Sequence, residues 1–239
     1  MGMDELNRII SSLERDRLRN LSIIGFAKNN PVCDIWQAGD SIAVMGTSDK
    51  NWIYFSSDNE DGFRHLVQLI NPDVTSFGSL SEWMIPLLSK NRKAEWILSA
   101  GNYYLPEDVN LNHIKVASRK LTETDIPHIL NHSLYKQYLS HEYLKDRIAK
   151  SYSAGIEMDG ELAAWGLTHD DGALGSLHVT DSYRGHGFAK EIIKSLVEQC
   201  RDNDEIPFAQ VEPDNTASAR LIEKFGFVKD RDIAWMKVI

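Results

Sequence analysis

The sequence predicts an α/β fold in two units, and three observations lead to this prediction. Short apolar runs between turn-forming residues are typical of strands, and they occur in both halves of the 239-residue chain. Longer segments with apolar residues three and four positions apart predict helices between these strands. A glycine-rich loop, 184–189, joins a strand pattern to a helix pattern in the second half. We therefore expect a mixed central sheet with helices packed against it.

Composition limits the possible partners. With 42% hydrophobic and 26% charged residues, the chain is typical of a globular protein. A net charge of −9 without a dense basic run argues against nucleic-acid binding. No apolar run reaches membrane-spanning length, so we expect a cytoplasmic protein that does not contact a membrane. We expect it to be a monomer or a homodimer. Cys33 and Cys200 lack the spacing of metal ligands, and no metal is expected.

The first unit, residues 1–112, reads as helical at its start and strand-rich afterwards. Leu6, Ile9, Ile10 and Leu13 recur with helical spacing behind Asp4. The expected elements are a helix at 4–20, strands at 22–26, 33–37, 41–46 and 52–56, a helix at 60–70, a strand at 74–77, a helix at 80–88 and a strand at 94–105. The polar segment 106–112 carries turn formers, and we place the boundary there.

The second unit, residues 113–239, alternates between the two patterns. Asp159-Gly160 between alternating apolar residues is a hairpin signal. The expected elements are a strand at 113–119, a helix opening at 121–127, a helix at 141–150, strands at 153–158, 161–168 and 174–180, a helix at 188–201, a strand at 207–211, a helix from 215 and a strand at 228–238.

The loop from Arg184 to Ala189 carries the strongest functional signal. Two glycines, Gly185 and Gly187, permit backbone conformations that other residues avoid. The first turn of the following helix has N–H groups without intrahelical partners and the positive end of the helix dipole. A diphosphate satisfies both, so the loop is predicted to bind phosphate. It matches neither a P-loop nor a Rossmann turn.

The spacing R-x-x-G-x-A, after a strand ending Leu-His-Val, resembles the coenzyme A loop of the GNAT acyltransferase superfamily. A second match follows downstream, where the superfamily has Asn-x-x-Ala/Ser, a short helix and Lys-x-Gly-Phe. The matching residues are Asn215, Ser218, Leu221, Lys224, Gly226 and Phe227. Tyr143-Leu144-Lys145, Ile206-Pro207-Phe208, Phe225-Gly226-Phe227 and Trp235 are similar to the glycine N-acyltransferase-like group.

The resemblance implies a fold, a co-substrate and a binding site. It implies the GNAT fold in the second unit and a degenerate copy of that fold in the first. The co-substrate would be acetyl-CoA or another acyl-CoA, without a metal. The backbone near Val179 would meet the thioester oxygen, and Asn215 would bond the pantetheine arm. The residues implied for coenzyme A binding are Leu177, Val179, Arg184, Gly185, His186, Gly187, Phe188, Ala189, Asn215 and Ser218.

Two departures from the family pattern concern proton transfer. Many members have a Glu as general base where this chain has Ala173, and a Tyr as acid where it has Ile222. Glu212 and His178 are therefore the candidate bases, with Glu212 ranked first and Asp171 behind both. Each also has a structural interpretation without a catalytic role. Glu212 is typical of a turn, and His178 of a residue packed on the strand face.

These observations predict an acyl-CoA-dependent N-acyltransferase that acts on a small-molecule amine. A catalytically silent acyl-CoA sensor is the first alternative, motivated by Ala173 and Ile222. A protein N-acetyltransferase is the second.

Overall fold

The computed structural model describes residues 2–111, 116–133 and 139–239. The chain forms two compact units, and each is described by itself. Unit 1 comprises residues 1–103, 211–221 and 229–239, and unit 2 comprises residues 104–210 and 222–228. Two segments from the end of the sequence thus lie in unit 1. The division at 112/113 stays a prediction about domains.

Unit 1 is a sheet with helices on both faces. Its elements are α1 (Met3–Leu13), α2 (Leu21–Asn29), β1 (Val32–Ala38), β2 (Ser41–Thr47), β3 (Asn51–Ser56), α3 (Glu60–Leu69), β4 (Ser76–Leu80), α4 (Ile85–Leu88), β5 (Ala94–Tyr104) and β10 (Val228–Val238). The strand order is β1-β2-β3-β4-β10-β5. β1, β2 and β3 are antiparallel, β4 runs parallel to β3, and β10 is antiparallel to β4.

Two apolar clusters form the core of unit 1, one on each face of the sheet. Side chains of α1 and α2, including Leu13 and Phe26, pack on Val44 and Tyr54. Phe63 of α3 belongs to the other cluster, together with the short helix α4 and the inward side chains of β3 and β4. Alternate residues of one strand therefore serve opposite faces, as the period of a β-strand requires.

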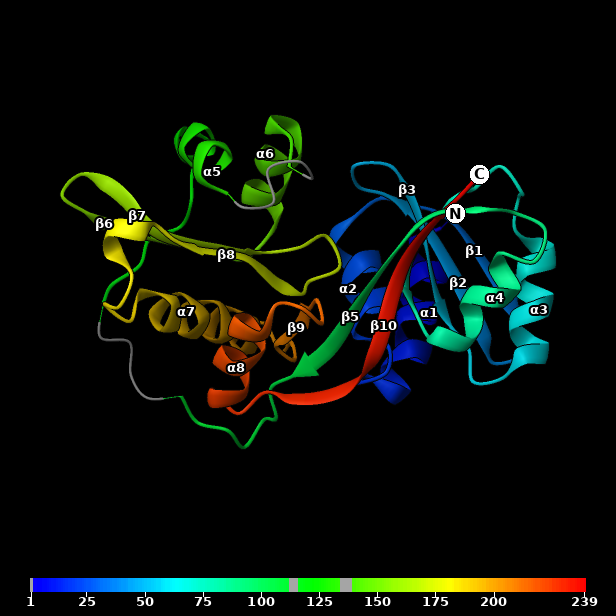
Figure 1. Ribbon diagram of the computed structural model, residues 1–239. Coiled ribbons are helices and arrows are strands. Elements are labelled where there is room, and N and C mark those ends of the chain that lie inside the picture. Colours follow the sequence, from blue (N-terminus) through cyan, green and yellow to red (C-terminus); the bar gives the residue numbers. More distant parts are fainter. Residues whose placement is uncertain (1, 112–115, 134–138) are drawn as a thin grey trace. The chain divides into compact units, whose positions relative to one another are not determined.

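Unit 2 has the same layered construction. Its elements are α5 (Ile126–His132), α6 (His141–Lys150), β6 (Ser153–Met158), β7 (Glu161–Thr168), β8 (Leu174–Val179), α7 (Phe188–Asp202) and β9 (Phe208–Val211), while α8 (Thr216–Lys224) is divided between the units. The order is β9-β8-β7-β6, antiparallel except for the parallel pair β8 and β9. α5 and α6 cover one face of this sheet and α7 the other (Figure 1).

The order of elements is repeated along the chain. Both halves read α, α, β, β, β, α, β, α, β among the described residues, apart from short 3-10 turns. In each half the first three strands are antiparallel and the fourth runs parallel to the third. The last strand of the second series, β10, lies in unit 1 beside β4. The first unit therefore contains the element order expected of a copy of the same fold.

Most predicted elements are confirmed, and one is wrong. Residues 22–26 were predicted as a strand, but they lie inside helix α2, Leu21–Asn29. The segment is apolar on nearly every side, so its periodicity does not separate a buried helix from a buried strand. The predicted helix 4–20 ends earlier, at Leu13, and continues as a 3-10 turn. The predicted strand 113–119 falls partly outside the described residues, and only Arg119 forms a β-bridge, with Gly155.

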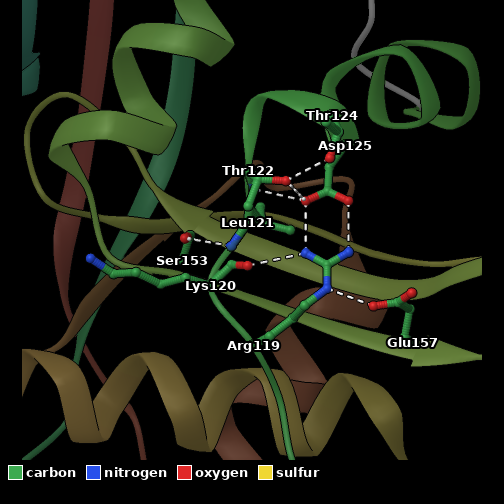
Figure 2. Close-up of polar contacts among 8 residues, drawn as sticks. All are labelled: Arg119, Lys120, Leu121, Thr122, Thr124, Asp125, Ser153 and Glu157. Atoms are coloured by element: carbon green, nitrogen blue, oxygen red, sulfur yellow. Dashed lines mark hydrogen bonds and ion pairs between the residues drawn. The ribbon is translucent and has the colours of Figure 1, made fainter.

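The start of α5 is fixed by a polar network (Figure 2). Thr122 and Asp125 form a reciprocal capping box around the turn that precedes the helix. The Arg119 guanidinium donates two hydrogen bonds of 2.8 Å to the Asp125 carboxylate and one of 2.7 Å to Glu157 on β6. Because Arg119 also bridges to Gly155, the network attaches α5 to the edge of the sheet. α5 also carries His128 and His132, on the face of the sheet that α5 and α6 cover.

Candidate functional site

β8 contains a bulge at the centre of unit 2. Leu167 of β7 pairs with Gly175, but the next paired residues are Trp165 and His178, so β8 has one extra residue. Ser176, within the bulge, has a left-handed φ of 48°, which is rare for a residue with a side chain. Bulges of this kind interrupt the ladder and redirect backbone groups. No such shift occurs between β2 and β3, the corresponding pair in unit 1.

The parallel strands β8 and β9 separate along their length. Leu174 and Ala209 form the one register pair of these strands among the described residues. Leu174 is buried, whereas every residue from Gly175 to Val179 is partly exposed, although β8 is an inner strand. An inner strand that reaches solvent on its carboxyl side marks an opening where ligands of α/β sheets commonly bind.

The loop after β8 contains two glycines in the left-handed region. Gly185 and Gly187 have φ of 82° and 83°, and an added Cβ at either position would meet no atom within 4 Å. The glycines are therefore needed for backbone conformation, and the space above them is open. Arg184, Gly185, His186 and Gly187 are all exposed, and Gly187 is the N-cap of α7.

The N–H groups of Phe188 and Ala189, the first two residues of α7, have no partner within the described residues. Among the described residues, no hydrogen bond is formed by the N–H groups of 185–189, and no side chain caps the helix. The Arg184 guanidinium lies beside this loop, 2.7 Å from the exposed Asp181 carboxylate. His186 stacks on Phe188, with ring centroids 5.7 Å apart. A backbone with several free N–H groups, a helix dipole and an arginine fits a diphosphate.

His178 lies on the face of β8 that α5 and α6 cover. Its ring stacks on Trp165, with centroids 4.4 Å apart. Trp165 also contacts His128, whose ring stacks on His132 at 4.2 Å. Burial lowers the pKa of His178, and the charges of Arg184 and His132 lower it further, while Asp181 opposes them. His178 is therefore held neutral at physiological pH, as a proton acceptor must be.

Glu212, Asn215 and Ser218 belong to unit 1. Glu212 directly follows β9 and is partly exposed. The Asn215 side chain accepts a hydrogen bond of 3.1 Å from the Ser218 N–H, which confirms Asn215 as the predicted cap of the helix. The structure brings Leu177, His178, Val179 and the loop 184–189 together in unit 2. The roles of Glu212, Asn215 and Ser218 in ligand binding stay predictions.

Two residues in the turn before β8 were missed or undervalued from the sequence. Asp171 is buried, and it accepts hydrogen bonds from the Ala173 N–H at 3.1 Å and from Gln210 at 2.7 Å. Burial raises the pKa of Asp171, the charge of Asp170 adds to the rise, and Gln210 and His169 oppose it. His169 places its ring against the backbone of Gly175. The only sequence signal was a glycine inside a strand, which indicates a close approach without naming the partner.

Within residues 2–111, 116–133 and 139–239, no three His, Cys, Asp or Glu side chains are grouped as metal ligands would be. None of the helices in those ranges has the length and apolar character of a membrane span.

Comparisons with known proteins agree with this construction. The FR47-like protein family model matches residues 154–236. A Drosophila protein has a TM-score of 0.80 at 16% identity, covering 100% of this chain and 97% of its own. A GCN5-related N-acetyltransferase-like protein from Streptococcus suis has a TM-score of 0.56 at 14% identity, with all of both chains covered.

A tandem GNAT protein from the clavulanic acid biosynthesis pathway has a TM-score of 0.54 at 13% identity, covering 92% of this chain and 87% of its own. No curated protein matches the sequence. At these identities the similarity establishes the fold alone. The chain therefore has the GNAT fold, in a two-unit arrangement also found in a tandem GNAT protein.

Proposed function

We propose that this protein transfers an acetyl or other small acyl group from coenzyme A to a small-molecule amine. The observation that carries the proposal is the uncapped start of α7 beside a bulged, partly exposed inner strand. The FR47-like match and the acetyltransferases among the structural neighbours support acyl transfer by a chain of this fold. Within the superfamily, the resemblance to the glycine N-acyltransferase-like group stays part of this proposal.

The diphosphate of coenzyme A would be held by the backbone of 185–189, with Arg184 contributing charge. An anion at this position gains hydrogen bonds from N–H groups that otherwise face only water. The pantetheine arm would run along β8, beside Leu177 and Val179. Asn215 and Ser218 are proposed to bind the same arm.

Coenzyme A would supply an activated thioester carbonyl. The chain must then provide a hydrogen-bond donor to the carbonyl oxygen as charge develops on it. The bulge interrupts the β7–β8 ladder at Ser176 and Leu177, two residues before Val179 in the same strand. We assign this role to the backbone near Val179.

A base must take the proton that the amine loses as the new C–N bond forms. Glu212 and His178 are the proposed candidates, in that order. Glu212→Gln would lower turnover by about a hundredfold or more if Glu212 is the base, with coenzyme A affinity unchanged. If His178→Gln has this effect and Glu212→Gln does not, the assignment moves to His178.

The experiment that tests the function is a screen for thiol release. Acetyl-CoA and longer acyl-CoAs are incubated with a panel of amino acids, polyamines and simple primary amines, and free coenzyme A is measured. Amine-dependent release with formation of the N-acyl product supports the proposal. Acyl-CoA binding without turnover over the whole panel would support a silent sensor, which Ala173 and Ile222 at the usual base and acid positions would explain.

A further inference from the structure

The turn between β7 and β8 carries His169, which has no role in the reaction described above. His169 follows the last residue of β7. Its N–H donates to the Ala173 carbonyl at 2.8 Å, and its carbonyl accepts from the Gly172 N–H at 3.0 Å. Both polar groups of its backbone are thus bonded within the turn.

The imidazole of His169 occupies the place of a side chain at Gly175. A Cβ added to Gly175 would lie 1.9 Å from Nε2 and 2.4 Å from Cδ2, far inside contact distance. Gly175 does not have the left-handed φ that explains Gly185 and Gly187. Its lack of a side chain is therefore explained by the approach of the imidazole alone.

This imidazole lies on the same face of the sheet as His178. Directly paired residues of antiparallel strands share a face, and Gly175 pairs with Leu167 as His178 pairs with Trp165. Leu167 and Trp165 both belong to the apolar cluster formed with α5 and α6. The two imidazoles therefore lie on one side of the bulge-containing strand, where Gly175 to Val179 are partly exposed.

Asp171 lies in the same turn as His169. Asp171 is buried and interacts electrostatically with His169. Its hydrogen bonds to Ala173 and Gln210 fix its position at the start of β8.

We propose that His169 receives the proton that a protonated acceptor amine must lose before it attacks. The inference rests on the proposed function. An alkylamine has a pKa of about 10, so it arrives as ammonium and two protons must leave its nitrogen. The first passes to the imidazole of His169 and frees the lone pair. The nitrogen then bonds to the acyl carbon, the C–S bond breaks with its electron pair on sulfur, and the second proton leaves through the base proposed above to the thiolate.

The position of His169 also relates to the missing family residue. Ala173, which stands where many relatives have a glutamate, is fully buried four residues further along. The histidine at the start of the same turn reaches β8 over Gly175 instead. A proton acceptor at the start of the central strand is thus retained, on a different residue.

The test compares two amines of different basicity. The best acceptor from the screen is paired with an analogue that carries a trifluoromethyl group on the carbon bearing the amine, because three fluorines leave that amine largely unprotonated at neutral pH. His169→Gln should lower kcat/KM about a hundredfold for the basic amine and by no more than about threefold for the fluorinated one. Affinity for coenzyme A, measured by calorimetry, should be unchanged. His141→Gln, an exposed histidine on α6, is the matched control and should change neither value.

A second variant displaces the imidazole without deleting it. Gly175→Ala should reproduce the selective loss, and the double variant should be no worse than either single one, because both remove the same contact. Equal losses for both amines, or none for the basic amine, would overturn the role of His169. Absence of turnover in the wild type with every amine would instead overturn the proposed function, and this inference with it.

Discussion

At the scale of single residues, Gly187 provides the sharpest test of the phosphate loop. Gly187→Glu would place a carboxylate where the diphosphate is expected, and like charges repel. We expect calorimetry to detect no coenzyme A binding by a variant that retains its circular dichroism spectrum. Gly39→Glu is the matched control, because Gly39 also has a left-handed φ, 60°, and an equally open Cβ position, in the β1–β2 turn of unit 1. Unchanged affinity in folded Gly187→Glu protein would contradict the assignment of the loop.

Residues also show how far the sequence could be read. The loop 184–189 and the cap Asn215 were predictable because their conformations depend on neighbours in the chain. His169 was missed because its relation to Gly175 depends on how a turn folds back over a strand. No local pattern contains that information.

At the scale of elements, the capping box of α5 links stability to pH. Burial alone would raise the pKa of Asp125, but hydrogen bonds from Arg119 and Thr122 lower it overall. The stabilisation is therefore present above the unfolded pKa of about 3.9 and is lost as pH falls through the lower folded value. Asp125→Ala should lower the free energy of unfolding by about 2 kcal/mol at pH 7, since it removes a cap and a partly buried ion pair.

Chemical denaturation at pH 7 and pH 3 measures this difference. The destabilisation by Asp125→Ala should be smaller at pH 3, because this pH lies below the unfolded pKa of about 3.9 and the unfolded state there binds the proton. Glu157→Gln removes the exposed partner of the same guanidinium and should cost less than about 0.5 kcal/mol. An equal cost for Asp125→Ala at both pH values would show that packing, not charge, determines the effect.

The two helices that follow the third strand of each repeat differ at their starts. α3 is capped by Asn59, whose side chain accepts from the Gly62 N–H at 2.8 Å, and Glu60 and Asp61 occupy its first turn. α7 has a glycine N-cap and no capping side chain. A capped, acidic helix start repels a phosphate that an open one attracts. We therefore expect one molecule of coenzyme A per chain.

Calorimetric stoichiometry measures this directly. A value near one that falls to zero in Gly187→Glu would place the single site at α7. A value of two, or a residual site in that variant, would show that the first repeat also binds the ligand.

Element types were predicted where periodicity or turn chemistry was strong, as in α7 and the β6–β7 hairpin. α2 was mistaken for a strand because nearly all of its side chains are buried. Its burial depends on the sheet of unit 1, which brings together residues far apart in sequence. Sequence patterns therefore reported local preference but not the layer in which a segment lies.

At the scale of the whole chain, the repeated order of elements and the two compact units have different boundaries. β10 completes the second series of elements, yet it pairs with β4 through Ala234–Leu80, Met236–Phe77 and Lys237–Ser76. The pairing of β10 with β4 could not be predicted from the sequence, because an apolar strand pattern does not specify its partner strand. It also means that a cut between the halves separates β10 from a neighbour in unit 1.

The last prediction follows from this pairing. A fragment of residues 113–239 lacks β4 and the cores of unit 1, so buried side chains of β10 such as Ala234, Met236 and Val238 would face water along an unpaired edge. We expect the fragment to keep helix and sheet signals but to aggregate on expression. Residues 113–227, which omit β10, should be more soluble if the unpaired strand is the cause. Light scattering and size-exclusion chromatography compare the two fragments. Soluble, monomeric 113–239 that binds coenzyme A with full affinity would show instead that the second repeat does not depend on unit 1.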